Sequence, residues 1–359
     1  MMKIMNDSLN THSKEAVELL KQLIATPSFS KEEDKTADII ESFLKSKGIE
    51  AQRYLNNVWA KNQHYDESKP TILLNSHHDT VKPNKGYTLD PFQPIEQDGK
   101  LYGLGSNDAG GCLVSLIATF LHFYKQRDLK YNLVLAATAE EEISGKNGVE
   151  VLLPLLPSID FGIVGEPTLL NMAVAEKGLL VLDCTAHGKA GHAAREEGDN
   201  AIYKALKDIE WFRSYKYDKV SDLLGPMKMS VTIINAGTQH NVVPHECKFT
   251  VDIRVNELYT FEEVLDIIHN NVECEVQPRS IRLRSTAIAI DHPLVQAGMA
   301  LGRTYYGSPT TSDKALMKFP ALKIGPGDSA RSHTADEYIF VEEIYEGVEM
   351  YIQLLEKIL

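Results

Sequence analysis

The chain has 359 residues, which is too long for one ordinary hydrophobic core and long enough for two domains. Apolar residues make up 43% and charged residues 24%, proportions that exclude a disordered chain. The formal net charge of −13 argues against nucleic acid and anionic membranes as partners, because both require concentrated basic patches. The expected partner is therefore a small molecule.

The cysteines and the hydropathy pattern indicate the compartment. The four cysteines have no metal-type spacing and are expected to be reduced core residues. The first ten residues lack the apolar core of a signal peptide. No apolar stretch reaches the roughly 20 residues that a membrane-spanning helix needs. These features predict a cytoplasmic protein.

Helices and short strands alternate in the first part of the chain. Two helices are expected, one from Ser13 and one over 39–44, the second preceded by a capping box of Ser30 and Glu33. Short apolar runs that resemble the buried strands of an α/β sheet follow at 71–75, 133–139 and 161–164. A helix over 110–124 separates the first two runs, which predicts a sheet flanked by helices.

From about Lys177 the predicted order changes to strand, helix, strand, strand, helix, strand, which is typical of a ferredoxin-like two-layer domain. Thr260 and Glu263 predict a capping box at the second helix. The strands are expected at 179–185, 227–234, 246–255 and 281–290, and the helices at 200–215 and 260–272.

After Pro293 the chain resumes with a helix, a strand over 321–324 and a final helix from Val341. Candidate site residues occur both before residue 170 and near residue 333. The smaller domain is therefore expected to be inserted into the larger one. The predicted boundaries are 1–176 and 291–359 for the larger domain, and 177–290 for the inserted domain.

Acidic and histidine side chains follow the predicted strands where each strand should end. His77 and Asp79 are two residues apart, which places both side chains on one face of an extended chain, so Asp79 can orient the His77 ring. A lone His-x-Asp pair is more often a surface ion pair. His78 leaves open which imidazole would bind a metal.

Asp108 lies in a glycine-rich turn that begins at Gly103, where small residues let the backbone and a ligand approach closely. A carboxylate there can bridge two metal ions, although by itself it would be an N-cap. The turn is not a dinucleotide-binding loop, because Asp108 occupies the place of the third glycine and would repel a pyrophosphate.

The consecutive glutamates Glu140, Glu141 and Glu142 disfavour each other's ionisation unless a cation neutralises them. One can bind a metal while its neighbour takes a proton from activated water. An acidic loop is the alternative. Glu166 and His333 are weak signals alone and count only as further members of this set.

In their order along the chain, these motifs resemble the M20 family of di-zinc metallopeptidases and deacylases. The matching motifs are His77-x-Asp79, Gly103-x-Gly105-x-x-Asp108, Glu141-Glu142, Gly165-Glu166-Pro167, Gly191-His192, Asn241-Val-Val-Pro244 and His333. The resemblance covers nearly the whole chain. It implies an α/β catalytic domain of the zinc-exopeptidase type, with a mixed sheet flanked by helices, and a βαββαβ lid and dimerisation domain.

The resemblance also implies two divalent metal ions, with zinc the expected metal and cobalt an alternative. The implied ligands are His77, Asp108 and Glu166 for one ion and Asp108, Glu142 and His333 for the other. Glu141 would be the general base, and Asp79 would orient His77. His78 and Glu140 depart from the usual family residues without removing a ligand.

In the inserted domain, the resemblance implies that His192 reaches the site of the partner subunit in a dimer and helps to stabilise the oxyanion. Asn241 would line the same pocket, and Arg254 would bind a substrate carboxylate. A salt bridge of Arg254 with Asp252 or Glu257 is the alternative. The remaining expected substrate-binding residues are Thr311, Gly325 and Gly327.

The segment 325–338 is more similar to acetylornithine deacetylases and related acylcitrulline and acylornithine deacylases than to succinyl-diaminopimelate desuccinylases. The predicted reaction is hydrolysis of the N2-acyl amide of an N-acyl amino acid in arginine biosynthesis, with acetyl or succinyl left open. A desuccinylase of that kind and an M20 dipeptidase or carboxypeptidase are alternatives. An inactive metal-binding scaffold is disfavoured because Glu141 is retained.

Overall fold

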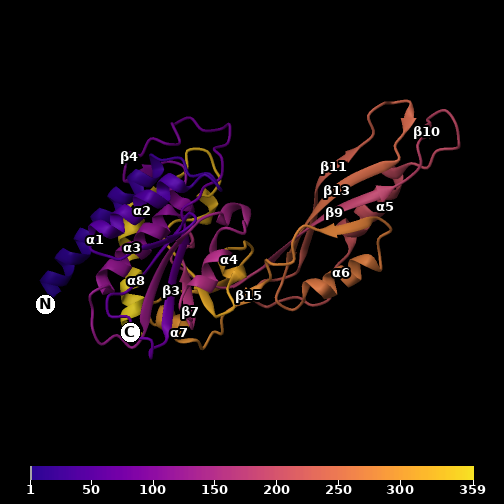
Figure 1. Ribbon diagram of the computed structural model, residues 1–359. Helices are drawn as coiled ribbons and strands as arrows, with labels where there is room; N and C mark the ends of the chain where they lie inside the picture. The colour runs from indigo at the N-terminus through magenta and orange to yellow at the C-terminus, as the bar shows by residue number, and fades with distance from the viewer. Residues whose placement is uncertain (1) are drawn as a thin grey trace. The chain divides into compact units, whose positions relative to one another are not determined.

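The structure is a computed structural model that describes residues 2–359, with side chains described from residue 10 (Figure 1). It divides into two compact units. The first unit contains Met1–Val174, Ile288–Tyr306 and Ser312–Leu359, and the second contains Ala175–Ala287 and Gly307–Thr311. Sequence analysis placed the boundaries at 176/177 and 290/291 and left 307–311 in the larger domain.

A mixed β-sheet forms the centre of the first unit, as predicted. The strand order is β1-β2-β6-β3-β7-β17-β8, and the sheet continues into β15 and β16, where the chain passes between the units. β6, β3, β7 and β17 are parallel, whereas β1, β2 and β8 are antiparallel to their neighbours. The bounds are β1 Gln52–Tyr54, β2 Asn57–Lys61, β3 Thr71–His77, β6 Asn132–Thr138, β7 Phe161–Val164, β8 Met172–Glu176, β15 Thr286–Ala287, β16 Tyr305–Ser308 and β17 Ala321–Lys323.

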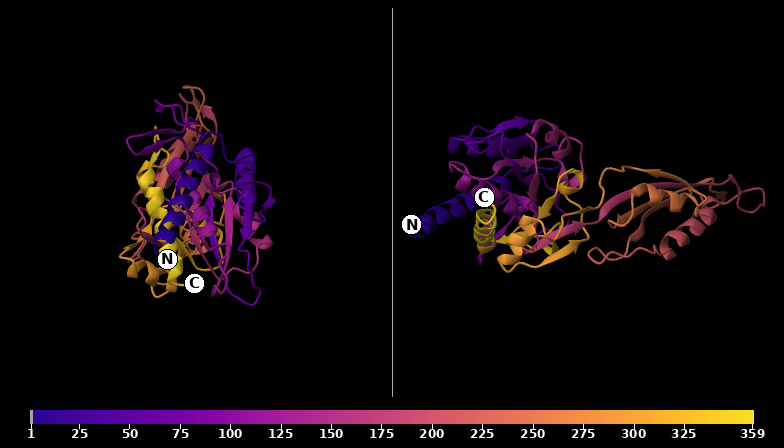
Figure 2. Two further views of the ribbon diagram at one scale, coloured as in Figure 1. Left: turned by 90° about the vertical axis from the view of Figure 1, so that its left-hand side faces the viewer. Right: turned by 90° about the horizontal axis from the view of Figure 1, so that it is seen from below.

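Helices cover both faces of this sheet, which is why its parallel strands are buried along their whole length. On one face α3 (Gly111–Phe123) packs against β3 and β6. The helices from the two ends of the chain, α1 (Met2–Ile24) and α8 (Val341–Glu356), pack beside α3 (Figure 2). On the other face, Leu73 and Val134 pack with Leu152 of α4 (Val149–Leu152).

The remaining elements of the first unit are peripheral. α2 (Asp34–Ser46) packs against α1 and β2, and α7 (Pro293–Ala300) packs against α8. A three-stranded sheet has the order β18-β5-β4. Its strands are β4 Ile95–Gln97, β5 Lys100–Tyr102 and β18 Tyr338–Phe340.

The second unit has the element order β9-α5-β11-β13-α6-β14, which is the predicted βαββαβ order. Its four-stranded antiparallel sheet has the order β11-β13-β9-β14. Alternate residues of β9, such as Leu180 and Leu182, pack with Phe212 of α5 and Val264 of α6. The bounds are β9 Gly178–His187, α5 Ala201–Ser214, β11 Lys228–Ala236, β13 Glu246–Val255, α6 Phe261–His269 and β14 Glu275–Pro278. β10 Gly191–His192 and β12 Val242–Val243 form a separate two-stranded antiparallel sheet.

The capping box of Thr260 and Glu263 is present at α6, but the one predicted at Ser30 and Glu33 is wrong. Glu33 is itself the N-cap residue of α2. The Ser30 hydroxyl instead donates to the Asp79 carboxylate at 2.7 Å. The first helix also begins at Met2 and not at Ser13.

The strand predicted at 281–290 is present only at Thr286–Ala287, as β15, and it pairs with β8 and not with the sheet of β9. The fourth strand of the second unit is β14, where Val276 lies opposite Cys184 of β9. Residues 281–284 alternate apolar and polar side chains like a strand, whereas β14 is short and ends in Pro278. A proline is tolerated there because β14 is the edge strand.

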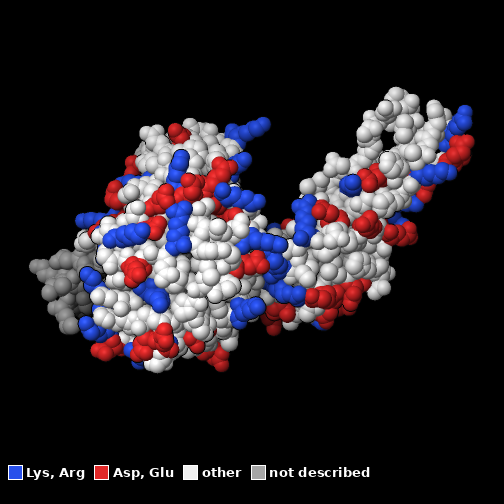
Figure 3. Space-filling view, viewed as in Figure 1, with Lys and Arg blue, Asp and Glu red and all other residues white. Residues whose placement is uncertain are grey.

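On the face of the molecule drawn in Figure 3, lysine and arginine side chains are interspersed with acidic ones. Within the described residues, no helix is both long and apolar enough to cross a membrane. All four cysteines are free thiols.

Candidate metal centre

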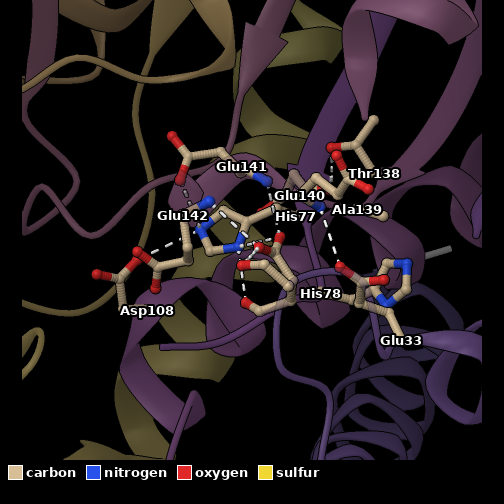
Figure 4. A network of polar contacts seen from close by, with 12 residues as sticks. Glu33, His77, His78, Asp108, Thr138, Ala139, Glu140, Glu141 and Glu142 are labelled. Carbon is tan, nitrogen blue, oxygen red and sulfur yellow. Dashed lines mark hydrogen bonds and ion pairs between the residues drawn. The ribbon is translucent and has the colours of Figure 1, made fainter. Parts of the chain in front are cut away.

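The candidate site lies at the carboxyl ends of the parallel strands β3, β6 and β7, where α/β sheets commonly bind ligands. His77 is the last residue of β3. Glu141 and Glu142 follow β6 in the short helix η2 (Glu141–Ile143), and Glu166 follows β7. Neighbouring parallel strands end at one edge of the sheet, so these residues meet although they are far apart in sequence. Figure 4 shows His77, Glu141 and Glu142 together at this edge.

Asp108 reaches this edge from η1 (Ser106–Gly110), the turn before α3. Gly105 precedes the turn with φ +75°, and a Cβ atom there would lie 2.5 Å from the Thr80 side chain. A larger residue would strain the backbone and displace Thr80. The glycine therefore allows the turn that directs Asp108 to the strand ends.

The two carboxylate oxygens of Asp108 face different histidines. Oδ1 lies 3.4 Å from His77 Nε2, and Oδ2 lies 3.6 Å from His333 Nε2. Glu142 Oε2 lies 2.9 Å from the same His333 nitrogen. Asp108 thus stands between two groups of nitrogen and oxygen donors, as a bridging carboxylate must.

His77 has a second pair of acidic neighbours. Glu141 Oε2 and Glu166 Oε1 each lie 3.9 Å from its Nε2 atom. This nitrogen is buried without a hydrogen-bond partner, while Nδ1 contacts the main-chain oxygen of Asp79 at 3.0 Å. An unpartnered imidazole nitrogen that faces several carboxylates fits a cation between them.

Among the described residues, two groups have donor atoms that all lie within 4.8 Å of one another. They are His77, Asp108 and Glu142, and His77, Glu141 and Glu166. Imidazole nitrogen and carboxylate oxygen are donors that suit zinc and related divalent ions. The residues present therefore fit a metal centre. Glu141, expected to be a base and not a ligand, lies as close to His77 as Glu166 does.

The His78 side chain points away from Asp108, Glu141 and Glu142 and lies beside Glu33 (Figure 4). Its Nδ1 bonds the Thr36 hydroxyl at 2.9 Å, and its Nε2 bonds the main-chain oxygen of Asn56 at 2.8 Å. Burial lowers the pKa of His78 to about 4, so the ring is neutral. Of the two imidazoles that the sequence left open, only that of His77 faces the cluster.

Asp79 holds the turn that carries the glutamates. Its Oδ1 accepts a hydrogen bond from the Glu141 main-chain nitrogen at 3.0 Å, and its Oδ2 accepts one from that of Glu142 at 3.2 Å. Oδ1 also lies 3.4 Å from His77 Nδ1. Burial alone would raise the pKa of Asp79, but its contacts with His77 lower it, so the carboxylate stays charged.

Burial and crowding change the protonation of the cluster. Burial raises the pKa of Glu141 well above its usual range, and the nearby charge of Glu166 adds to this effect. Burial also raises the pKa of Glu142. The hydrogen bond to Glu142 raises the pKa of His333 to about 9. The arrangement supplies carboxyl groups with perturbed pKa values, as functional sites often do.

Metal removal should destabilise the protein, because carboxylates that a cation neutralises repel one another without it. A ligand at 100 times its Kd stabilises the folded state by about 2.7 kcal/mol, so its removal should lower Tm by roughly 3–4 °C in a protein of this size. Calorimetry after dialysis against a chelator, and again after zinc is restored, measures this shift. An unfolding temperature that changes neither when the metal is removed nor when zinc is restored would contradict the metal centre.

Two buried acids of the site were missed by sequence analysis. Asp313 accepts a hydrogen bond from the Thr138 hydroxyl at 2.7 Å, and burial raises its pKa to about 6. Glu337 bonds the main chain of the Asp108 turn. Asp313 does not follow a strand, so no pattern marked it. The position of Glu337, four residues after His333 in one loop, was the only available signal.

His192 and Asn241 belong to the second unit. The antiparallel pairing of β10 with β12 places His192 opposite Val242, and the Ala193 main-chain nitrogen bonds the Asn241 main-chain oxygen at 3.0 Å. Both residues are exposed. The structure thus brings together two residues that sequence analysis assigned to one pocket.

Arg254 and Thr311 also lie in the second unit. Arg254 makes two bonds to Asp252, from Nε at 2.8 Å and from Nη2 at 3.0 Å. This is the salt bridge that the sequence offered as an alternative to substrate binding. The Thr311 hydroxyl donates to the Lys177 main-chain oxygen at 2.9 Å.

Gly325 and Gly327 lie in the first unit and allow close packing of the site turns. A Cβ atom at Gly325 would lie 2.6 Å from the main-chain oxygen of Glu166. At Gly327, where φ is +87°, it would lie 2.5 Å from the side chain of Asn107. Larger residues would therefore disturb the turns that carry Glu166 and Asp108.

The model of peptidase family M20/M25/M40 matches residues 73–357. The chain belongs to this family. Its relatives include a succinyl-diaminopimelate desuccinylase of Buchnera aphidicola, 31% identical over 71% of this chain and 72% of that protein. They also include an acetylornithine deacetylase of Proteus mirabilis, 29% identical over 95% and 96% of the two chains.

Among solved structures, the YXEP protein of Bacillus subtilis has a TM-score of 0.73 and 16% identity, covering 96% of this chain and 98% of its own. It is described as a dinuclear metal-binding peptidase from the M20 family. At 16% identity, this similarity shows a shared fold. Family membership confirms that the chain is a metal-dependent M20 hydrolase of the peptidase and amidohydrolase type.

Proposed function

We propose that this M20 hydrolase cleaves the N2-acyl amide of an N-acyl amino acid in cytoplasmic arginine biosynthesis. The candidate substrates are N-acetylornithine and the acetyl or succinyl derivatives of ornithine and citrulline. The observation that carries the hydrolytic centre is the position of Asp108, whose two oxygens face His77 and His333. The acetylornithine deacetylase among the relatives supports the substrate class.

Two zinc ions, or alternatively cobalt ions, are proposed for the centre. The proposed ligands are His77, Asp108 and Glu166 for one ion and Asp108, Glu142 and His333 for the other. Bound ions of this kind polarise the amide carbonyl and make water acidic enough to lose a proton near neutral pH. The imidazole and carboxylate donors of the set support zinc.

Glu141 is proposed as the general base. It would take a proton from the attacking water and then deliver it to the leaving α-amine. Burial raises the pKa of its carboxyl above the usual range, which is the direction that makes a carboxylate a stronger base. The bond from its main-chain nitrogen to Asp79 holds the η2 turn in place for this task.

The second unit is proposed as the lid and dimerisation domain of a homodimer. His192 would act in the site of the partner subunit, where it would donate a hydrogen bond to the oxyanion, and Asn241 would line the same pocket. Arg254 would bind the substrate carboxylate and would then exchange or share its bond with Asp252. The remaining proposed substrate-binding residues are Thr311, Gly325 and Gly327.

A substrate panel tests this assignment. N-acyl ornithine or citrulline should give the highest kcat/KM, and the carboxamide of the same compound should be poor, because a bidentate arginine recognises a carboxylate. Arg254→Lys should raise KM, since lysine lacks the planar two-bond contact. Asp252→Asn is the matched control, because it removes the partner of Arg254 and should not raise KM.

A second candidate function is the removal of succinate from succinyl-diaminopimelate, favoured by the 31% identical Buchnera relative. The panel therefore includes succinyl-diaminopimelate and a dipeptide. A higher kcat/KM for either compound would overturn the arginine-pathway assignment and leave the proposed metal centre intact.

A further inference from the structure

Glu337 is a buried carboxylate that the proposed mechanism does not use. It is 2% exposed and lies four residues after His333, in the segment that leads into β18. Its main-chain oxygen accepts a hydrogen bond from the Gly103 nitrogen at 3.0 Å, so its backbone is fixed beside the glycine-rich turn.

The side chain of Glu337 accepts hydrogen bonds from three main-chain nitrogens of one turn. Oε1 accepts from Asn107 and from Asp108, each at 2.9 Å. Oε2 accepts from Gly105 at 3.1 Å. All three donors belong to the chain that carries the Asp108 carboxylate to the strand ends.

This turn needs an outside acceptor because its backbone is not helical. Asp108 has φ −115° and ψ 100°, and Gly105 has φ +75°. Buried main-chain nitrogens in such a turn must find acceptors elsewhere. A carboxylate is a strong acceptor and can serve several nitrogens at once. Glu337 therefore fixes the backbone that leads into Asp108, from Gly105 to the main-chain nitrogen of Asp108 itself.

The segment that supplies Glu337 also carries His333 and is fixed on its other side. The Asn84 side chain donates to the His333 main-chain oxygen at 3.2 Å. The carboxylate of Asp336 accepts from the Thr88 main-chain nitrogen at 2.8 Å and from its hydroxyl at 2.6 Å. Glu337 thus joins the Asp108 turn to a segment that hydrogen bonds to Asn84 and Thr88 already fix in place.

We propose that Glu337 is a positioning residue that sets the place of Asp108 relative to His333 and thereby the affinity of the metal centre. It acts through the main chain of Asp108 and contacts neither substrate nor metal. The inference rests on the proposed function, in which both residues are ligands. It adds a residue outside the ligand set whose loss should weaken metal binding.

The test compares Glu337→Gln with the matched control Glu343→Gln. Glu343 is a partly buried carboxylate in the same region of the sequence. It accepts hydrogen bonds from Arg331 at 2.6 and 2.8 Å and makes none with the Asp108 turn. Metal-free proteins are titrated with Co²⁺ and Zn²⁺ by calorimetry, and the visible spectrum of the Co²⁺ form is recorded. Circular dichroism and thermal unfolding of the metal-free proteins report on folding.

Glutamine keeps the Oε1 acceptor but places an amide donor against the Gly105 nitrogen. Glu337→Gln should therefore fold and show an altered Co²⁺ spectrum. It should bind metal about 10–100-fold more weakly, because the loss of a group that supports a metal ligand typically has an effect of this size. Glu337→Asp, which keeps a carboxyl group on a shorter side chain, should lose less affinity. Glu343→Gln should bind metal like the wild type.

Wild-type affinity and an unchanged Co²⁺ spectrum in a folded Glu337→Gln protein would overturn the proposal. So would failure of both Glu337 variants to fold while Glu343→Gln folds, since the carboxylate would then serve folding in general. A wild-type protein that binds no metal would instead reject the proposed function.

Discussion

Replacing Glu141 with glutamine should lower kcat by about 10²–10⁴ while both metal ions stay bound, because the side chain is proposed to move protons and not to hold a cation. Glutamine has nearly the same shape but cannot accept a proton at neutral pH. The measurements are kcat on an N-acyl amino acid and the metal content of the purified variant. The bond from the Glu141 main chain to Asp79 does not depend on the side chain, so the turn should survive.

The neighbouring glutamates provide the comparison. Glu142→Ala should lose metal as well as activity, because Glu142 is a proposed ligand. Glu140→Gln should keep both, because the Glu140 carboxylate bonds the side chain and main chain of Asn147, outside the cluster. Glu141 lies 3.9 Å from His77 Nε2, as Glu166 does. Metal loss in Glu141→Gln equal to that in Glu142→Ala would make Glu141 a ligand and reject its role as base.

His192→Ala should lower kcat by about 10²–10³, which is typical for the loss of one donor to an oxyanion. If His192 acts in the site of the partner subunit, mixing this variant with Glu141→Gln should restore activity. In the hybrid dimer, one site combines an intact Glu141 with an intact His192 from the other chain. Activity is followed after mixing under conditions in which subunits exchange.

The control mixture contains Glu141→Gln and Glu142→Ala. Both substitutions affect the acid cluster of their own subunit, so no hybrid has an intact site and activity should stay low. Subunit exchange is checked separately with differently tagged chains. If exchange occurs and the His192→Ala mixture stays inactive, the role of His192 in the partner site is wrong.

The strand-end residues could be found from the sequence because each follows a short apolar run, and parallel strands end at a common edge. His77, Glu142 and Glu166 were visible in this way. The orientation of their side chains could not be predicted from the sequence. The choice between His77 and His78 depends on Thr36 and Asn56, which a linear pattern does not place beside the ring.

Other features escaped sequence analysis for similar reasons. Glu337 is recognisable only through main-chain nitrogens that lie some 230 positions earlier in the chain, a contact that no local pattern encodes. The edge strand β14 is only four residues long, which is too short for its alternation to mark a strand, whereas residues 281–284 show the same alternation without joining the expected sheet. Local periodicity predicted elements well where they form a core and poorly at edges.

The insertion has a consequence for synthesis on the ribosome. β17 pairs with β7 and β8 inside the sheet of the first unit, yet it is made only after the whole second unit. Until Ala321–Lys323 emerge, the nascent first unit has an open gap beside β7. The main-chain groups of β7 that face this gap are unpaired and can pair with other chains. Such distant pairing slows folding. The second unit, which is continuous apart from Gly307–Thr311, can fold during this interval, so mainly the first unit remains to be completed when β17 emerges.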